Sequence, residues 1–272
     1  MKGEGEMAFN TLKQKIEERL LKIDGIGSLF IETEGQSITI NPDRKMKAAS
    51  VIKLPILLEG YRQIDSGIIS GTDRISLSKK ELVGGSGILA HLESVRELSV
   101  HDILMLMTIV SDNTASNLAI KHLGMENING LTAMLGCTNT VLGRQFMDLE
   151  AAEKGLDNFT SARDMVLCLK EADTGKTLAK KSRQQVIHTL KQQQLTANLH
   201  GRIDEDSEVS IASKSGSLSG VVNDVGMIEL SGQKVYVAVL LGDLPDNHTG
   251  QEIIADIGWY IHEYLHEMEK TR

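Results

Sequence analysis

Segments that resemble β-strands lie at the two ends of this 272-residue sequence, and a long helix-rich stretch separates them. They are rich in apolar and β-branched residues and cover 28–34, 37–40, 209–214, 225–230 and 234–241. Gly35-Gln36 separates the first two runs, which is the pattern of a β-hairpin. No linker rich in proline, glycine or serine divides the chain. We therefore expect both ends to contribute to one sheet in a single domain.

Helical periodicity dominates the rest of the sequence. In the middle, apolar residues recur at helical spacing over about 49–66, 99–109, 112–123, 126–135, 161–173 and 181–194. Similar patterns occur near the ends, at Phe9, Leu12, Ile16 and Leu20 and over 249–268. These patterns predict a single domain over 1–272 with terminal helices packed on the sheet. The sheet part covers about 1–42 and 196–272, and the helical part about 43–195.

The composition excludes several classes of partner. The 29 basic and 37 acidic residues give a net charge of −8, and aromatic residues make up only 3%. No basic block stands out, so we expect neither a nucleic-acid nor a membrane partner. No apolar run is long enough to span a membrane, and the N-terminal segment lacks the apolar core of a signal peptide. We expect a cytoplasmic monomer, unless an export signal has been removed, with Cys137 and Cys168 as reduced thiols.

The first chemical signal is Ser50-Val51-Ile52-Lys53. On a helix that begins near residue 49, Ser50 and Lys53 lie one turn apart on the same face. A serine hydroxyl becomes a good nucleophile when a base takes its proton, and a desolvated lysine with a lowered pKa can be that base. Taken alone, the S-x-x-K pattern occurs by chance in most proteins.

Two further signals are equally weak when each is taken alone. Ser111-Asp112-Asn113 lies between two predicted helices, where Ser or Asp often only caps the second helix. Lys214-Ser215-Gly216-Ser217 ends a predicted strand, and a simple turn accounts for its glycine. A lysine on a strand, beside a hydroxyl and a glycine, is nevertheless suited to bind a substrate carboxylate.

Together, and in this order, the three motifs resemble the S-x-x-K, S-D-N and K-T/S-G set of class A β-lactamases and their penicillin-binding-protein relatives. The similarity runs from about residue 25 to the C-terminus and includes LSVHDILMLMTIVSDNTASNLAIKHLG, SRQQVIHTLKQQQ and IASKSGSLSGVVNDVGMI. It implies an α/β (α+β) fold with a five-stranded antiparallel sheet flanked by terminal helices. An all-helical subdomain would be inserted between strands 2 and 3. The resemblance implies no cofactor and no metal.

The resemblance also implies how the reaction would begin. Ser50 would be the nucleophile, with Lys53 as its neighbouring base. Ser111 would relay a proton to the leaving nitrogen. The backbone N–H groups of Ser50 and Ser217 would form the oxyanion hole, where each donor can contribute about 3 kcal/mol to the transition state.

The remaining matches concern the substrate, expected to be a small-molecule β-lactam or a related peptide or ester. Lys214 would hold the substrate carboxylate and tune the relay serine. Ser215 would stand in for the family's threonine, followed by Gly216 of the same motif. Asn113 would bind the amide of the acyl side chain.

One loop departs from the resemblance. Class A β-lactamases have R-x-E-x-x-L-N where this chain has Arg144-Gln145-Phe146-Met147-Asp148-Leu149-Glu150. Phe146 therefore stands at the position of the glutamate that, with the asparagine, holds the deacylating water. Glu150 stands at the asparagine position, one helical turn along, and is a tentative catalytic residue if it reaches the same water. A loop ion pair of Glu150, for instance with Arg144 or Arg163, is the simpler alternative.

These observations leave three functions open. The first is a class A-type serine hydrolase, acylated at Ser50, that hydrolyses the acyl-enzyme slowly because Phe146 replaces the glutamate. The second is a penicillin-binding-type D-Ala-D-Ala carboxypeptidase or esterase, which Phe146 favours and the absence of an export signal weakens. The third is a β-lactam sensor that acylates and stays acylated.

The segment His262-Glu263-Tyr264-Leu265-His266 fits H-E-x-x-H, the helical zinc motif of metalloproteases. No third ligand follows it, and the same helix carries an apolar stripe suited to packing on the sheet. We therefore interpret the motif as a coincidence on an amphipathic helix and expect no metal there.

Overall fold

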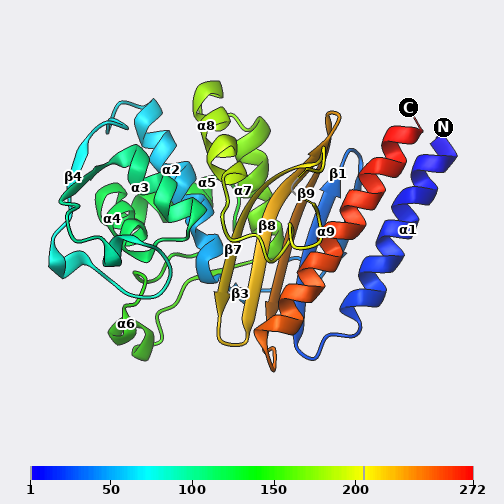
Figure 1. The fold of residues 1–272 in the computed structure, drawn as a ribbon, viewed down its shortest axis with the longest axis horizontal. Coiled ribbons are helices and arrows are strands. Elements are labelled where there is room, and N and C mark those ends of the chain that lie inside the picture. Colours follow the sequence, from blue (N-terminus) through cyan, green and yellow to red (C-terminus); the bar gives the residue numbers. More distant parts are fainter. Residues whose placement is uncertain (1, 205, 272) are drawn as a thin grey trace.

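A five-stranded antiparallel sheet forms the middle layer of the molecule, in the order β2-β1-β9-β8-β7 (Figure 1). The computed structural model describes residues 2–204 and 206–271, so the two ends of the predicted domain, residues 1 and 272, lie outside the described residues. The strands cover Ile26–Thr33 (β1), Gln36–Ile40 (β2), Ser210–Leu218 (β7), Val221–Leu230 (β8) and Gln233–Gly242 (β9). The predicted sheet, built from both ends of the chain, is confirmed.

Strand β8 begins at Val221, before its predicted start, because two polar residues that interrupt the apolar pattern are part of it. Asn223 and Asp224 are fully buried in this strand. The Asn223 side chain pairs inside the sheet, where its Oδ1 accepts a hydrogen bond from the Leu241 N–H at 3.2 Å. A buried amide is tolerated when its polar atoms are hydrogen-bonded, so the strand continues through the polar pair.

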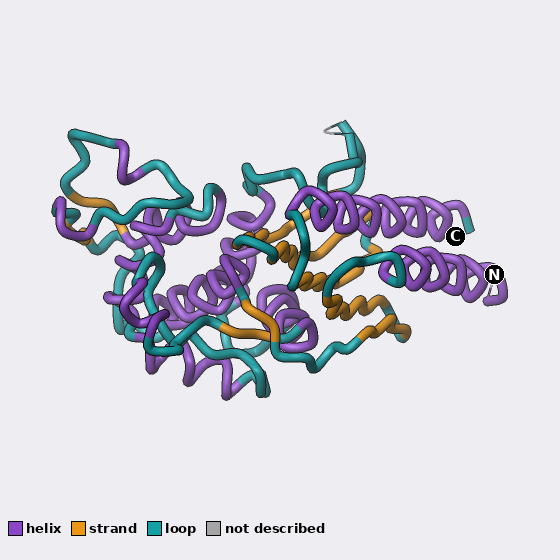
Figure 2. Tube along the Cα trace, turned by 90° about the horizontal axis from the view of Figure 1, so that it is seen from below, coloured by secondary structure: helices purple, strands orange, loops and turns teal. Residues whose placement is uncertain are grey.

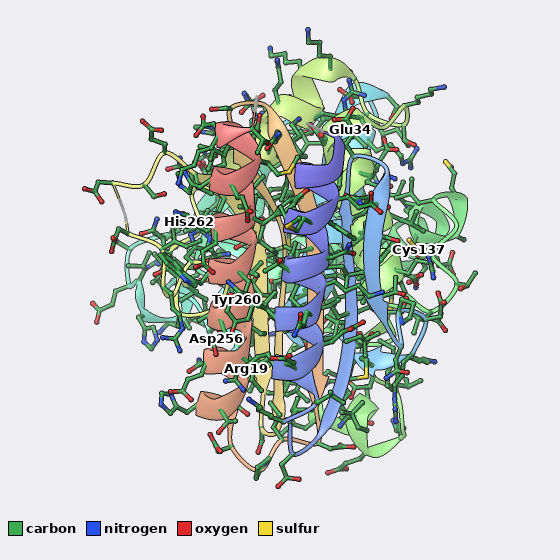
Figure 3. The ribbon with its side chains drawn as sticks, turned by 90° about the vertical axis from the view of Figure 1, so that its right-hand side faces the viewer. Arg19, Glu34, Cys137, Asp256, Tyr260 and His262 are labelled. Atoms are coloured by element: carbon green, nitrogen blue, oxygen red, sulfur yellow. The ribbon has the colours of Figure 1, made fainter. Side chains whose placement is uncertain are left out.

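The two terminal helices, α1 (Lys2–Leu20) and α9 (Asn247–Lys270), lie side by side on one face of the sheet (Figures 1 and 3). Their apolar stripes are buried against the strands and include Leu12, Ile16, Ile253, Ile257 and Ile261. Ion pairs join the two helices along their outer seam, from Arg19 to Asp256 at 2.6 Å and from Lys15 to Glu263 at 3.0 Å. The predicted packing of both terminal helices on the sheet agrees with this arrangement.

The helical part lies on the other face of the sheet (Figure 2). Its helices are α2 (Lys53–Asp65), α3 (Val100–Ile109), α4 (Asn113–Leu123), α5 (Met125–Met134), α6 (Leu149–Glu153), α7 (Ala162–Thr174) and α8 (Lys180–Lys191). Most of α2 is buried, including Leu54, Ile56, Leu57 and Leu58. A helix that is buried on all sides serves as the axis of a helical core, and α2 contacts α3, α4, α5, α7 and α8.

The helical part also contains short strands, so the prediction of an all-helical insertion was wrong in this detail. β3 (Met46–Lys47) pairs with β6 (Phe159–Thr160), and β4 (Arg74–Ser76) pairs with β5 (Glu97–Ser99). Segments of two or three residues are too short to give a period-2 pattern in the sequence. Among the described residues, no helix combines the length and the apolar character needed to cross a membrane.

Candidate active site

Ser50 lies on a 3-10 turn, η1 (Ala49–Ile52), and Lys53 begins the helix α2 that follows. The predicted helix from residue 49 thus starts with a tighter turn, on which residues three apart eclipse each other. Asn223 of β8 holds this turn from behind, because its Nδ2 donates to the carbonyl oxygens of Lys47 at 2.9 Å and Ala48 at 3.1 Å. The half-buried Ser50 hydroxyl has no hydrogen-bond partner in the described part of the chain, so it is free to turn.

Gly216 brings strand β7 directly against the backbone of the Ser50 turn. A Cβ atom at position 216 would lie 2.6 Å from the Ser50 nitrogen and 2.9 Å from the Val51 nitrogen. Real side chains do not approach backbone so closely, so only glycine allows this contact. Ser217 follows on the same strand and is exposed. The predicted oxyanion-hole residues, Ser50 and Ser217, are therefore brought to neighbouring backbone segments.

The Lys53 Nζ lies among the residues of the S-D-N motif. It is 2.7 Å from the Ser111 carbonyl oxygen, 3.0 Å from the Ser111 Oγ and 3.0 Å from the Asn113 Oδ1. Lys53 is fully buried, and this burial lowers its pKa well below the usual value, with the nearby Lys214 charge acting in the same direction and Asp112 opposing. A buried lysine with a lowered pKa is equipped to take a proton.

Asp112, the middle residue of the S-D-N motif, has a structural role. Its Oδ1 caps α4 by accepting from the Ala115 N–H at 2.9 Å. Its Oδ2 accepts from the N–H groups of Ile88 and Leu89 at 2.7 and 2.8 Å. Both oxygens are thus occupied, and they tie the loop before α3 to the start of α4. The sequence interpretation of a helix cap was correct for this residue.

Lys214 is fully buried on β7, and its Nζ donates to the Ser215 carbonyl oxygen at 2.7 Å. Burial lowers the pKa of Lys214 to about 8, while the nearby Asp224 carboxylate opposes this shift. Burial also raises the pKa of Asp224 to about 7, and its Oδ2 accepts from the Leu199 N–H at 3.1 Å. Asp224 was not predicted as a site residue. Its only mark in the sequence is that it is an acid within the apolar pattern of a strand.

Most of the predicted site residues line a single cleft of about 230 Å³. Its lining consists of Ser50, Ser86, Ser111, Leu195, Thr196, Ala197, Asn198, Ser215, Gly216, Ser217 and Gln251. These side chains come from η1, from two loops within the helical part, from the loop after α8, from β7 and from α9. No carboxylate is among the lining residues that the structure describes. Gln251, on the first turns of α9, was missed because no motif marks it.

Phe146 faces the same lysine from the opposite loop. Its ring centroid lies 4.3 Å from the Lys53 Nζ, a cation–π distance. Asn117 of α4 holds the Phe146 backbone with two hydrogen bonds, from the Phe146 N–H to Oδ1 at 2.8 Å and from Nδ2 to the Phe146 carbonyl oxygen at 2.9 Å. Asn117 lies one helical turn after Asn113, and this spacing is the signal that could have identified it.

Glu150 does not reach this cluster, and the structure does not support its tentative catalytic role. Its side chain is 79% exposed and pairs with Lys154 at 2.6 Å. Asp148 caps α6 by accepting from the Ala151 N–H at 2.9 Å, and Glu150 lies in the first turn of that helix. The simpler alternative, a loop ion pair, describes Glu150 correctly, although its partner is Lys154 rather than an arginine.

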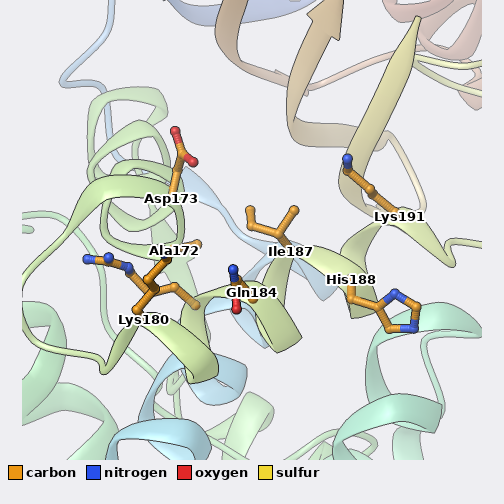
Figure 4. Close-up of a pocket in the computed structure, with 8 residues that line it drawn as sticks. Ala172, Asp173, Lys180, Gln184, Ile187, His188 and Lys191 are labelled. Atoms are coloured by element: carbon orange, nitrogen blue, oxygen red, sulfur yellow. The ribbon is translucent and has the colours of Figure 1, made fainter. Parts of the chain in front are cut away.

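A second hollow, of about 410 Å³, lies beside α7 and α8 (Figure 4). Its lining consists of Ala172, Asp173, Lys180, Arg183, Gln184, Ile187, His188 and Lys191. None of the predicted site residues lines this hollow. It contains no serine or cysteine that could act as a nucleophile, so the cleft at Ser50 remains the candidate active site.

The fold, and the lysine-bearing serine cleft at the boundary of its two parts, are those of a serine hydrolase. The family model of the Beta-lactamase enzyme family matches residues 11–265. The chain therefore belongs to the β-lactamase enzyme family.

Known proteins similar to this chain carry three different descriptions. The crystal structure of a β-lactamase from Sphaerobacter thermophilus has a TM-score of 0.85 and 30% identity, over 93% of this chain and 96% of that one. The structure of PBP-A has a TM-score of 0.85 and 24% identity, over 94% and 96% of the two chains. The β-lactamase regulatory protein BlaB of Streptomyces cacaoi is 33% identical over 85 residues, which span 30% of this chain and only 27% of BlaB.

Proposed function

We propose that this protein is a serine hydrolase that is acylated at Ser50 by β-lactams or related amides and esters, and that releases the acyl group slowly. The observation that carries this proposal is the position of Phe146. Its ring covers the lysine at 4.3 Å, at the place where class A enzymes have their water-activating glutamate. The means of acylation and the means of deacylation are thus separated in this chain.

Acylation rests on Lys53 and its contacts. Neutral Lys53 can take the Ser50 proton directly after a side-chain rotation, or through the Ser111 hydroxyl, which lies 3.0 Å from Nζ. As the Ser50 oxygen attacks the carbonyl carbon, the N–H groups of Ser50 and Ser217 would stabilise the developing oxyanion. The proton then passes from Lys53, through Ser111, to the leaving nitrogen. Protonated Lys214 would hold the substrate carboxylate near Ser215.

Deacylation needs a water molecule and a base that activates it. The Phe146 side chain offers a water molecule neither a proton acceptor nor a hydrogen bond, and its ring covers the Lys53 Nζ. Glu150 is ion-paired to Lys154 at the surface. General-base help contributes on the order of 10²–10⁴ in rate, so its loss gives a long-lived acyl-enzyme.

A penicillin-binding-type carboxypeptidase or esterase is the second candidate. Phe146 favours it as well, because such an enzyme turns over its own substrate while β-lactams remain bound. The similarity to PBP-A concerns the fold and is compatible with this candidate. A sensor that never turns over is a third candidate. The similarity to the regulatory protein BlaB gives it little support, because it covers only 85 residues.

One experiment separates the three candidates. The purified protein is incubated with nitrocefin and with a fluorescent penicillin, and both turnover and the lifetime of the covalent adduct are recorded. We expect a mass increase of one acyl group on Ser50 that persists for minutes to hours, with slow nitrocefin turnover. Turnover at many cycles per second would contradict slow deacylation. A stable adduct with hydrolysis of D-Ala-D-Ala peptides or esters would favour the second candidate, and no turnover of any substrate the third.

A further inference from the structure

Two histidines of α9 stand with their ring nitrogens face to face, far from the cleft at Ser50. The Nε2 atoms of His262 and His266 are 3.1 Å apart, and their ring centroids are 4.4 Å apart. His262 lies on the side of α9 that is turned away from α1, towards the loop that precedes β7 (Figure 3). Ser207 of that loop places its Oγ 3.3 Å from the same His262 nitrogen.

The arrangement leaves metal-binding capacity unused. Two Nε2 atoms at 3.1 Å share a single proton, because two lone pairs or two N–H groups would repel each other. The His262 Nδ1 is buried and has no hydrogen-bond partner. The His266 Nδ1 lies 3.9 Å from a Glu269 carboxylate oxygen, so a negative charge stands near this ring. Without that proton, a cation placed to one side of the line between the two Nε2 atoms would bind both lone pairs.

We propose that His262 and His266 form a two-nitrogen chelate for a divalent transition-metal ion such as Cu²⁺, Ni²⁺ or Zn²⁺. With imidazole–metal distances of about 2.0–2.1 Å, a separation of 3.1 Å between the two nitrogens gives an angle of about 100° at the metal. This value lies close to the angle between neighbouring ligands in square-planar and octahedral sites. The metal lies to one side of the line that joins the two nitrogens, so each ring must turn until its lone pair points at the ion, while the separation of the nitrogens already suits it.

The site differs from a metalloprotease centre, although the two histidines belong to an H-E-x-x-H segment. Glu263 points to α1, where it pairs with Lys15 at 3.0 Å, so it cannot serve as a base for a metal-bound water. No group of three or more His, Cys, Asp or Glu side chains suited to a metal occurs among the described residues. Water would complete the coordination, with the Ser207 hydroxyl nearby. The proposed site is thus an exchangeable one that links one turn of α9.

Affinity for the metal is expected to follow ligand preference. Imidazole binds Cu²⁺ more tightly than Ni²⁺ or Zn²⁺, so Cu²⁺ gives the lowest Kd of the three. Because the two nitrogens converge only when α9 is helical, the metal binds the folded protein and raises its Tm. The metal lies outside the cleft, so acylation of Ser50 proceeds with or without it.

The single tryptophan of the sequence provides a direct readout. The Trp259 ring stacks on His262, with centroids 4.8 Å apart and an angle of 16° between the planes. An open-shell ion on His262 therefore quenches the indole emission. The full-length protein is titrated with CuCl₂ at neutral pH while the indole emission is recorded. EDTA is then added, and the emission is recorded again. We expect saturable quenching with one equivalent of Cu²⁺, and full recovery with EDTA.

Matched variants distinguish the chelate from general copper binding. His266→Gln removes one ligand but leaves the stacked pair intact, and we expect its Kd to rise at least tenfold. His262→Gln is the second variant. His248→Gln is the control, because His248 lies on the same helix but is 80% exposed and pairs with Glu252 at 3.6 Å. An unchanged Kd in His266→Gln, or an equal loss in His248→Gln, would overturn the proposal. Circular dichroism and acylation of Ser50 verify that each variant is folded.

Discussion

The two sides of the cleft differ in how their side chains are held. On one side, Lys53 is buried and hydrogen-bonded to Ser111 and Asn113. On the other, an apolar ring covers the lysine, while Glu150 and Asp157 of the loop pair with basic side chains of the same loop. In the proposed function, forming the acyl-enzyme and releasing it therefore depend on different elements of the fold. One function can therefore change while the other is kept.

The loop keeps its shape without a catalytic acid. Asn117 fixes the Phe146 backbone, and Arg144 pairs with Asp157 at 2.9 Å. The Asn158 Oδ1 also accepts hydrogen bonds from the N–H groups of Gly143 and Arg144. None of these contacts involves the side chain at position 146. The backbone is thus prepared to hold either an aromatic ring or a carboxylate at this position.

The largest expected effect is on the acylating side. Ser50→Ala removes the atom proposed to form the covalent bond, so we expect the rate of acylation to fall by at least about 10⁴-fold. Mass spectrometry after incubation with a fluorescent penicillin measures the adduct. The Ser86→Ala variant is the control, because Ser86 also lines the cleft but has no assigned role. An adduct of normal yield in Ser50→Ala would place the nucleophile elsewhere.

Lys53→Met tests the base on the same side. Methionine is of similar length and apolar, so it preserves the packing of α2 but cannot take a proton. We expect the acylation rate to fall by about 10²–10⁴-fold, while the lifetime of the adduct that still forms changes much less. Stopped-flow fluorescence measures the first quantity and mass spectrometry the second. If only the lifetime of the adduct changed, Lys53 would act in the release of the acyl group and not in acylation.

Phe146→Glu tests whether the missing base alone limits release. The carboxylate would lie near Lys53 and could activate water, so we expect the adduct lifetime to shorten by roughly 10–10²-fold. Phe146→Gln is the matched control, because glutamine has the same shape and hydrogen-bonds water but accepts no proton. If Gln shortened the lifetime as much as Glu, access of water and not base catalysis would be the limiting factor.

The pH dependence of acylation tests Lys214. Its pKa is lowered to about 8, so the protonated form that binds a substrate carboxylate is lost as pH rises above that value. We expect kcat/KM for carboxylate-bearing substrates to fall about tenfold per pH unit in that range. Asp224→Asn removes the charge that raises this pKa and shifts the fall to lower pH. A neutral ester substrate should show no such fall.

The smallest expected effect is that of Glu150→Gln. Glu150 is exposed and paired with Lys154, and surface pairs of this kind contribute about 0–1 kcal/mol. Because Glu150 makes only this weak surface pair, we expect the lifetime of the adduct to change less than about twofold in Glu150→Gln. Lys154→Gln provides the matched removal of the partner. A much longer lifetime in Glu150→Gln alone would restore this residue as the base.

Sequence patterns predicted those parts of the molecule that depend on local spacing. Ser50 and Lys53 sit three residues apart on consecutive helical turns, and the apolar stripe of α9 follows the helical period. The pairing of Phe146 with Lys53 was not predictable, because it depends on how a loop folds back on a helix. Glu150 was misplaced because the cap at Asp148, and thus the start of α6, sets its direction.

The buried polar residues of β8 mark another limit of sequence reasoning. Asn223 breaks the apolar pattern of its strand, yet it supports the turn that carries Ser50. Asp224 similarly influences Lys214 from a strand without a motif. Such residues look like interruptions until the pairing of β7 with β8 is known. Asn223 acts across more than 150 residues of chain and Asp224 across a strand pair, and spacing along the chain encodes neither contact.

The strand order also determines how long the first strand waits for its partner during synthesis. Residue 26 of β1 pairs with residue 242 of β9, so the first strand leaves the ribosome roughly 10–40 s before its partner at typical elongation rates. The helical part is complete by then and already carries Ser50, Lys53 and Ser111. Strand β7, whose Gly216 packs against the Ser50 turn, is synthesised only with the last quarter of the chain. Nascent protein therefore carries Ser50, the proposed nucleophile, long before the cleft around it is complete, and we expect acylation only after the last strands have joined the sheet.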